Sequence, residues 1–284
     1  MRRALLLLPV LALLFAGCAA DEVGDDATTP SSEGGSEEGS ESNLTSGKAL
    51  RIMSYNIKYG QLVGLDLSKL AAVIKESNPD IIGLQEVDDG TRRSNGKKET
   101  DELATLTGMT HRFYGSAFDF DGGRYGLAIL SKFPLSNTRV VRLDDRTRPE
   151  NGFEPRISVV ADVEVPGETI RFATLHASLH EEEHRLNGQR LLDALGDRKD
   201  QSIVVGDFNE KPGETIGDML TGAGMTDAYN EKHRFFGFTS PAQFPIKRID
   251  FIYRGRSFGK TRHAWVPDSK ASDHRPVATV IPMD

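Results

Sequence analysis

Apolar residues recur along the chain in two patterns, and the commoner pattern predicts β-strands. Short runs rich in β-branched and aromatic residues are bounded by Gly, Pro, Asn or Asp, which is typical of strands that end in turns. Such runs occupy residues 50–57, 80–84, 126–130, 156–165, 169–175, 202–205, 249–253 and 277–281. We expect a strand in each of them.

The second pattern predicts helices between some of these strands. The stretch from Leu67 to Ile74 has apolar residues at i, i+3, i+4 and i+7, and Pro79 ends that helix before the next strand. Two further helices are expected over residues 100–107 and 182–195.

Strands outnumber helices, and several strands follow each other directly, as in residues 156–175. This order favours two stacked mixed sheets with helices outside over a purely parallel α/β sheet. The alternation is too irregular for a barrel of eight βα units. No internal repeat or second linker interrupts residues 49–284, so we expect them to form one domain.

The first 18 residues resemble a bacterial lipoprotein signal peptide. Residues 4–16 form an apolar run after two arginines, shorter than the roughly 20 residues that span a bilayer. The run ends in Phe15-Ala16-Gly17-Cys18, which resembles a lipobox and predicts lipidation of Cys18, although a buried free thiol is the alternative. We therefore expect a protein of the bacterial cell envelope, anchored in the membrane by lipid, with its folded domain outside the cytoplasm.

Residues 19–48 are rich in Gly, Ser, Thr and acids, and we expect a disordered tether there. Eight of the 42 acidic residues and three of the 35 basic residues precede residue 49, which leaves 34 acids and 32 bases in the domain. Proteins dedicated to binding duplex DNA usually carry a clear basic excess, because phosphate neutralisation supplies much of their affinity. No obligate protein partner is evident.

Polar residues that suit phosphoester hydrolysis follow several predicted strands. Glu86 and Asn56 supply the oxygen ligands that Mg²⁺ prefers, although a solvated acid and a turn-forming amide are the alternatives. Asp207 and Asn209 flank Phe208, so in an extended segment both lie on one side, where a carboxylate can take a proton from water. An Asp-Phe-Asn turn that caps the strand is the alternative.

Two histidines at the ends of predicted strands are further candidates for this chemistry. His274 stands beside Asp273 just before the last predicted strand, and His176 ends the strand over 169–175. An adjacent acid and imidazole can divide their roles between a metal and a phosphate. A histidine at the end of a strand is, in isolation, more often structural.

Taken together, these motifs resemble the endonuclease/exonuclease/phosphatase superfamily from about residue 50 to 282. The motifs are Ser54-Tyr55-Asn56, Leu84-Gln85-Glu86, Tyr125-Gly126-Leu127-Ala128-Ile129-Leu130-Ser131, Pro155-Arg156, Thr174-Leu175-His176, Gly206-Asp207-Phe208-Asn209, Arg248-Ile249-Asp250 and Ser272-Asp273-His274. The resemblance implies a four-layer α/β/β/α sandwich of two mixed sheets with outer helices. It also implies Mg²⁺- or Mn²⁺-dependent phosphoester cleavage by water, without a covalent intermediate.

The resemblance also implies a role for each matching residue. Glu86 would bind metal, with Asn56 nearby and Asp273 in the same cluster. His274 would act as an acid or base, and Asp207 would activate water. Asn209 and His176 would hold the phosphate, and Asp250 would orient these catalytic groups. Two further residues would contact the substrate, namely Tyr125 and Arg156.

Two other functions fit parts of the chain. His180-Glu181-Glu182-Glu183-His184 matches the H-E-x-x-H signature of zinc metalloproteases, but Glu182 and Glu183 are too polar for the buried helix of such a site. We expect a charged loop that opens the helix over 182–195. A non-catalytic binding lipoprotein of the same fold is the second alternative.

The substrate stays open between nucleic acid, a phospholipid headgroup and a sugar phosphate. The best basic cluster comprises Arg139, Arg142, Arg146 and Arg148, interrupted by two acids, and it is interpreted as a solvated loop.

Overall fold

A computed structural model describes residues 49–233 and 235–283 of the 284-residue chain. The expected signal peptide, Cys18 and the tether over 19–48 lie outside the described residues. No helix in the described ranges is long and apolar enough to cross a membrane.

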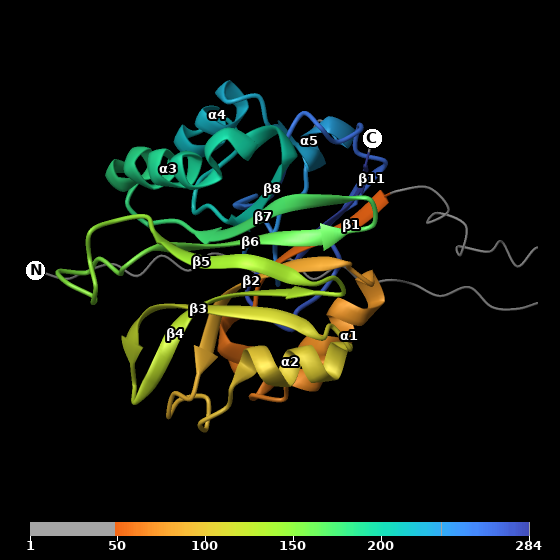
Figure 1. Cartoon of the computed structure of the whole chain (residues 1–284). Coiled ribbons are helices and arrows are strands. Elements are labelled where there is room, and N and C mark those ends of the chain that lie inside the picture. Colours follow the sequence, from red (N-terminus) through yellow and green to blue (C-terminus); the bar gives the residue numbers. More distant parts are fainter. Residues whose placement is uncertain (1–48, 234, 284) are drawn as a thin grey trace, which may run out of the picture. The chain divides into compact units, whose positions relative to one another are not determined.

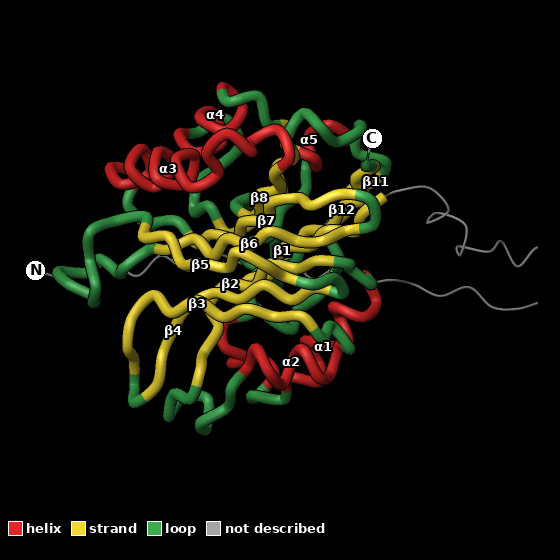
Figure 2. Tube along the Cα trace, viewed as in Figure 1, coloured by secondary structure: helices red, strands yellow, loops and turns green. Residues whose placement is uncertain are grey.

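Two six-stranded sheets form the centre of the domain (Figure 2). The first sheet has the order β11-β12-β1-β2-β4-β3, with β1 Ala49–Asn56, β2 Ile81–Asp89, β3 His111–Phe120, β4 Gly123–Ser131, β11 His263–Trp265 and β12 Val277–Pro282. The second has the order β5-β6-β7-β8-β10-β9, with β5 Leu135–Arg142, β6 Ile157–Val165, β7 Glu168–His176, β8 Ser202–Asp207, β9 Thr226–Asp227 and β10 Asp250–Arg254.

Helices cover the outer faces of both sheets (Figure 1). The first sheet is covered by α1 Leu67–Ser77 and α2 Glu99–Thr107, and the second by α3 Glu181–Leu195 and α4 Thr215–Gly222. The short α5 Ala228–Lys232 contacts β10 and β11, and the 3₁₀ turns η2 Lys58–Val63 and η3 Gly196–Gln201 follow β1 and α3. The expected four-layer α/β/β/α sandwich of two mixed sheets is confirmed.

Local sequence explains how α1 begins and ends. The Asp66 carboxylate accepts a hydrogen bond from the backbone amide of Ser68, which satisfies one of the free donors at the helix start. Asn78 ends the helix with a φ of 45°. The four apolar residues spaced between Leu67 and Ile74 are all buried, as their periodicity predicts.

The eight predicted strands are present, but β3, β5, β9 and β11 were not predicted. The strand β5 lies at a sheet edge and is largely exposed, so its sequence lacks a strand's apolar pattern. The interpretation of the arginine cluster as a solvated loop was therefore wrong for Arg139 and Arg142, which lie on β5. Their guanidinium groups donate to the carbonyl oxygens of Ala194 and Ala117, both at 2.7 Å.

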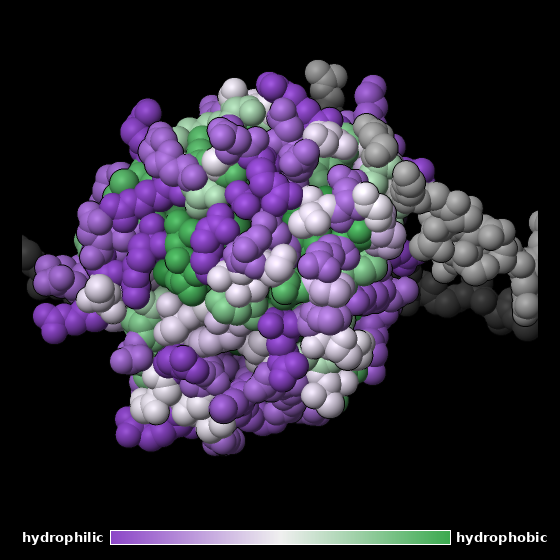
Figure 3. Space-filling view, viewed as in Figure 1, coloured by the Kyte–Doolittle hydropathy of each residue, from purple (hydrophilic) through white to green (hydrophobic). Residues whose placement is uncertain are grey.

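Three hydrophobic clusters hold the layers together. One lies between the two sheets, one beneath α1 and α2, and one beneath α3 and α4. On the face in Figure 3, hydrophilic residues cover most of the surface, and apolar residues show through between α3 and β5. Every member of the three clusters lies between residues 50 and 283, so this part of the chain contains its own core and we expect it to fold by itself.

The two sheets approach each other closely at Gly83 on β2. A Cβ atom at this position would overlap the side chains of Val205 and Thr174 on the facing sheet. The lack of a side chain at Gly83 therefore permits β2 to pack closely against Val205 and Thr174 of the second sheet.

Replacing Gly83 with Ala should lower the free energy of unfolding by about 1–3 kcal/mol, because the added methyl group forces packed side chains apart. Urea denaturation measures this change. Gly222→Ala is the matched control, since a Cβ there meets no atom within 4 Å. Equal urea midpoints for the two variants would contradict the proposed close packing at Gly83.

Candidate active site

Strand direction brings the polar residues of both sheets to one edge of the sandwich. The pairs β1/β2 and β7/β8 are parallel, so their carboxyl ends lie at the same edge. Asn56 ends β1, and His176 and Asp207 end β7 and β8, where they stand opposite each other in register. The strand β10 runs antiparallel to β8, which places its first residue, Asp250, opposite Asp207.

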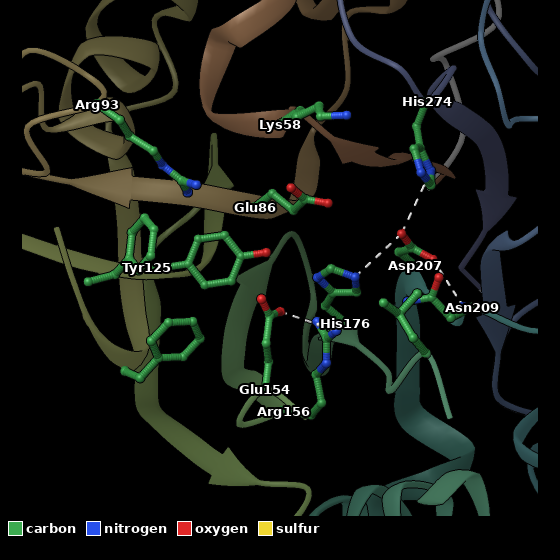
Figure 4. A pocket seen from close by; sticks show the side chains of 13 residues that line it. Lys58, Glu86, Arg93, Tyr125, Glu154, Arg156, His176, Asp207, Asn209 and His274 are labelled. Carbon is green, nitrogen blue, oxygen red and sulfur yellow. Dashed lines mark hydrogen bonds and ion pairs between the residues drawn. The ribbon is translucent and has the colours of Figure 1, made fainter. Parts of the chain in front are cut away.

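Glu86 is directed by a bulge in β2. The pairing of β2 with β4 shifts between Leu84 and Val87, and Glu86 has a φ of 56°. A positive φ is costly for a residue with a side chain, and such strain often accompanies functional positions. Here it directs the Glu86 carboxylate into the cavity (Figure 4).

Asn56 links the two sheets through its side-chain amide. Its Nδ2 atom donates to Glu86 Oε1 at 2.9 Å and to Asp207 Oδ2 at 3.0 Å, while its Oδ1 atom accepts from the backbone amide of Lys58. The amide therefore holds two carboxylates side by side, one from each sheet.

These residues surround a cavity of about 330 Å³ (Figure 4). Its lining combines acids, bases and aromatic rings, namely Lys58, Glu86, Arg93, Phe118, Phe120, Tyr125, Glu154, Arg156, His176, Leu179, Asp207, Asn209 and His274. Seven of the ten residues predicted for the site line it. The other three do not line the cavity but contact residues that do. Asn56 contacts Glu86, Asp250 contacts His274, and Asp273 contacts Lys58.

His274 is held between two carboxylates. Its Nδ1 atom lies 2.9 Å from Asp250 Oδ2 and 3.7 Å from Asp207 Oδ2. Burial by itself would lower the pKa of His274, but these two negative charges outweigh it and raise the pKa to about 10. The imidazole is therefore a cation at neutral pH in this structure. Burial raises the pKa of the Asp207 carboxyl.

His176 has the opposite electrostatic character. Its Nε2 atom lies 3.6 Å from Asp207 Oδ2, and its buried Nδ1 atom has no hydrogen-bond partner. Burial, followed by the neighbouring charges of Arg156 and His274, lowers the pKa of His176 well below its usual value. One edge of the cavity thus offers a neutral imidazole beside an imidazolium.

Glu86 lies close to a second charged pair. The Lys58 ammonium donates to Asp273 Oδ2 at 2.5 Å, and this bond raises the pKa of Lys58. Burial raises the pKa of Glu86, and the nearby Asp273 adds to the effect. A partly buried carboxylate whose charge is incompletely balanced is a suitable ligand for a cation.

The sequence did not identify Arg93 as part of the site. Its Nε and Nη2 atoms each donate to the buried Asp88 carboxylate at 2.7 Å, and its guanidinium lies 3.7 Å from the centre of the Tyr59 ring. A signal existed, because Arg93 follows Glu86 closely in the chain. Its position in the cavity depends on the loop folding back, which no local pattern predicts.

The other lining residues that were missed are Lys58, Phe118, Phe120, Glu154 and Leu179. Lys58 lies two positions after Asn56, and proximity to that motif was the only available signal. Glu154 forms an ion pair with Arg156, which the sequence had indicated, and its Oε2 atom lies 3.3 Å from Arg156 Nη2.

Residues 53–274 match the Endonuclease/Exonuclease/phosphatase family. The chain belongs to this family. Its members are phosphoric ester hydrolases and typically use a divalent metal. The resemblance that the motifs indicated is therefore confirmed.

The chain shares only low sequence identity with individual proteins that it resembles. The uncharacterized protein YbhP of Escherichia coli is 26% identical over 144 residues, which cover 49% of this chain and 55% of that protein. The chain thus spans about half the length of the curated relatives it matches. The solved structure of a family member from Beutenbergia cavernae is 21% identical and has a TM-score of 0.66, with 83% of this chain and 72% of that one covered. The mannosyl-6-phosphatase Bt3783 of Bacteroides thetaiotaomicron is 19% identical and has a TM-score of 0.64, with 82% and 99% covered.

The Endonuclease/Exonuclease/phosphatase domain has one compact group of potential metal ligands in its described part. Donor atoms of Asp207, Asp250 and His274 all lie within 4.8 Å of one another. In this arrangement, however, the His274 imidazolium already balances one of the two negative charges of Asp207 and Asp250. Glu86 is the carboxylate of the cavity that lacks such a partner.

The H-E-x-x-H stretch forms no zinc site in this domain. His184 is buried, with Nε2 2.8 Å from the carbonyl oxygen of Ser178 and Nδ1 3.3 Å from Glu210 Oε2. His180 precedes α3 and stacks on Phe153 with ring centres 3.9 Å apart. Both ring nitrogens of His184 thus have protein partners, which argues against the metalloprotease alternative. The helix begins at Glu181, one residue before the predicted start.

Proposed function

We propose that this protein is a divalent-metal-dependent phosphoester hydrolase that cleaves by direct attack of water. The observation that carries this proposal is the position of Asp207, whose Oδ2 atom lies near Asn56, His176 and His274 at the wall of one cavity. A carboxylate, a neutral imidazole and an imidazolium then face the same small volume. Such a set can remove a proton, hold a phosphoryl group and protonate or stabilise a leaving oxygen.

Glu86 is the residue that we propose as the metal ligand, with Asp273 nearby. Their donor atoms are carboxylate oxygens, which Mg²⁺ and Mn²⁺ prefer. The Asn56 amide donates one hydrogen bond to Glu86 and another to Asp207, so we assign Asn56 the task of orienting the Glu86 ligand. A bound cation would neutralise charge on the phosphoryl oxygens.

Asp207 is the proposed base toward water. Burial raises its pKa, which makes the carboxylate a better proton acceptor. The Asn56 amide and the backbone amide of Asn209 donate to its two oxygens and hold it in place. His274 would act as the acid, or as a cation that stabilises the departing oxygen, and Asp250 would keep it protonated.

The remaining residues would bind the phosphate. Arg156 lines the cavity, and its pairing with Glu154 at 3.3 Å would hold its guanidinium in place to bind a phosphoryl oxygen. Asn209 and His176 would hold the phosphoryl oxygens, and Tyr125 would contact the part of the substrate beside the phosphate. The cavity size favours a phosphoryl group with a compact substituent over a DNA duplex, and a sugar phosphatase among the similar structures supports that choice.

The place of action remains a proposal from the N-terminal sequence. Lipidation of Cys18 after export would anchor the protein in the cell envelope and place the domain outside the cytoplasm. Globomycin-sensitive processing, or loss of membrane association in Cys18→Ser, would test this.

Chelation of divalent metal should abolish hydrolysis of bis-p-nitrophenyl phosphate by the purified protein, and Mg²⁺ or Mn²⁺ should restore it. Binding should also raise the Tm, because a cation that binds only the folded state stabilises it. Glu86→Gln should lose this Tm shift, since the ligand charge is gone.

Glu154→Gln is the matched control, because Glu154 lines the same cavity but faces Arg156. This variant should keep the metal-dependent Tm shift. An equal shift in wild type and Glu86→Gln would overturn the assignment of Glu86 as ligand, and full activity in excess EDTA would overturn the metal-dependent mechanism.

A further inference from the structure

Large apolar side chains are concentrated in one exposed loop, which we call the phenylalanine loop (residues 235–246). Half of the ten exposed large hydrophobic residues in the described parts of the chain belong to it, namely Phe235 at 72%, Phe236 at 75%, Phe238 at 39%, Phe244 at 79% and Ile246 at 70% exposure. Single exposed apolar residues are ordinary, but a cluster of this kind marks an interaction surface.

Positive charges surround this loop. Lys211, Lys232 and Lys247 are exposed, and their ammonium groups have no ion pair with any described residue. Two acids near the loop in the sequence are already paired, since Asp227 binds Arg248 and Glu231 binds an arginine of β10, while the exposed Glu214 accepts from the backbone amide of Lys211. The surface is therefore both apolar and cationic.

The loop also lines a second cavity, separate from the active site. It has a volume of about 430 Å³ and its wall includes Phe235, Phe236, Phe238 and Ile246, with Lys211 and Lys247 at the same opening. Apolar side chains and ammonium groups thus share one hollow.

Hydrogen bonds tie the phenylalanine loop to the segment that carries Asp273 and His274. The backbone amide of Ala242 donates to the carbonyl oxygen of Asp273, and that of Arg275 donates to the carbonyl oxygen of Thr239, both at 2.7 Å. A partner bound at the loop is therefore held next to the active-site segment.

We propose that the phenylalanine loop is a docking surface for an anionic phospholipid bilayer. Aromatic and aliphatic side chains enter the boundary between headgroups and acyl chains, while lysines bind the lipid phosphates. The expected lipid anchor at Cys18 would keep the domain close to such a surface, although the proposal does not depend on hydrolysis.

Other occupants fit this surface less well. Ile246, at 70% exposure, has no π face on which a nucleic acid base could stack, and the domain carries no basic excess. A symmetric contact between two copies would bring the same three lysines from each copy into one interface, which gathers six positive charges there.

Co-sedimentation of residues 49–284 with vesicles tests the proposal. We expect binding to vesicles of equal phosphatidylglycerol and phosphatidylcholine, and much weaker binding to phosphatidylcholine alone. Phe244→Ser with Ile246→Ser should reduce the partition coefficient by at least about tenfold, because two apolar side chains no longer leave water. Lys232→Gln with Lys247→Gln should remove the preference for the anionic lipid.

Leu62→Ser with Leu186→Ser is the matched control, since both residues are exposed apolar side chains outside the loop. It should bind vesicles like the wild type. Hydrolysis of bis-p-nitrophenyl phosphate by the loop variant should stay unchanged, which shows that the domain remains folded. The proposal fails if the wild type does not bind anionic vesicles, or if the loop variant and the control bind equally. It also fails if the loop substitutions instead abolish binding to a single-stranded oligonucleotide or dimerisation in sedimentation velocity.

Discussion

Asp207→Asn should lower kcat for bis-p-nitrophenyl phosphate by about 10²–10⁴-fold, the usual range for loss of one proton-transfer group. The amide has nearly the same shape as the carboxylate but cannot take a proton from water. It also removes one of the two negative charges that keep His274 protonated. Steady-state kinetics with saturating Mg²⁺ measures the effect, and KM should change much less than kcat.

Asp162→Asn separates this loss from damage to the fold. Asp162 is buried on β6, where it binds Arg171 at 2.9 Å and Arg198 at 3.0 Å, and it does not line the cavity. Its replacement should lower the urea midpoint and leave kcat close to that of wild type. An Asp207→Asn enzyme that retains more than about a tenth of wild-type kcat would contradict the role of Asp207 as base.

Asp250→Asn should make hydrolysis sensitive to alkaline pH. In the wild type the carboxylates of Asp250 and Asp207 raise the pKa of His274 to about 10, so the imidazolium persists throughout the neutral range. Without the Asp250 charge this pKa falls toward the ordinary value of about 6.5. At pH 8.5 the variant would then have lost the proton that the wild type keeps, and its kcat should be at least about tenfold lower than at pH 6.

The pairing of Asp250 with His274 also makes the free energy of unfolding depend on pH, which supplies a readout independent of catalysis. A folded-state pKa raised above the unfolded value contributes stability that is fully present below about pH 6.5 and is lost as pH rises through about 10. In metal-free buffer, the urea midpoint of the wild type should therefore fall across this window, and that of Asp250→Asn should fall less. Parallel pH profiles for the two proteins, in both kcat and urea midpoint, would refute the pairing of Asp250 with His274.

How much of the fold could be predicted depended on how far each element is buried. The central strands β1, β2, β7 and β8 are almost entirely buried, and each contains a short apolar run that predicts it. The edge strands β3 and β5 are partly exposed and carry charges, and they form because a neighbouring strand pairs with them. Local sequence carries little information about such pairing.

By itself, the sequence determined the family, the layered sheet-and-helix architecture and the polar residues that follow the central strands. These features depend on apolar periodicity and on short motifs, which are local properties of the chain. The tertiary structure decided which charges balance one another. Only the folded chain brings Asp207 and Asp250 to His274, leaves Glu86 without a comparable partner, and adds Lys58 and Arg93 to the cavity. It also decided that the phenylalanine loop stays exposed. The physical reason is that burial, electrostatic shifts in pKa and surface exposure depend on distances between residues far apart in the sequence, and packing of the two sheets sets those distances.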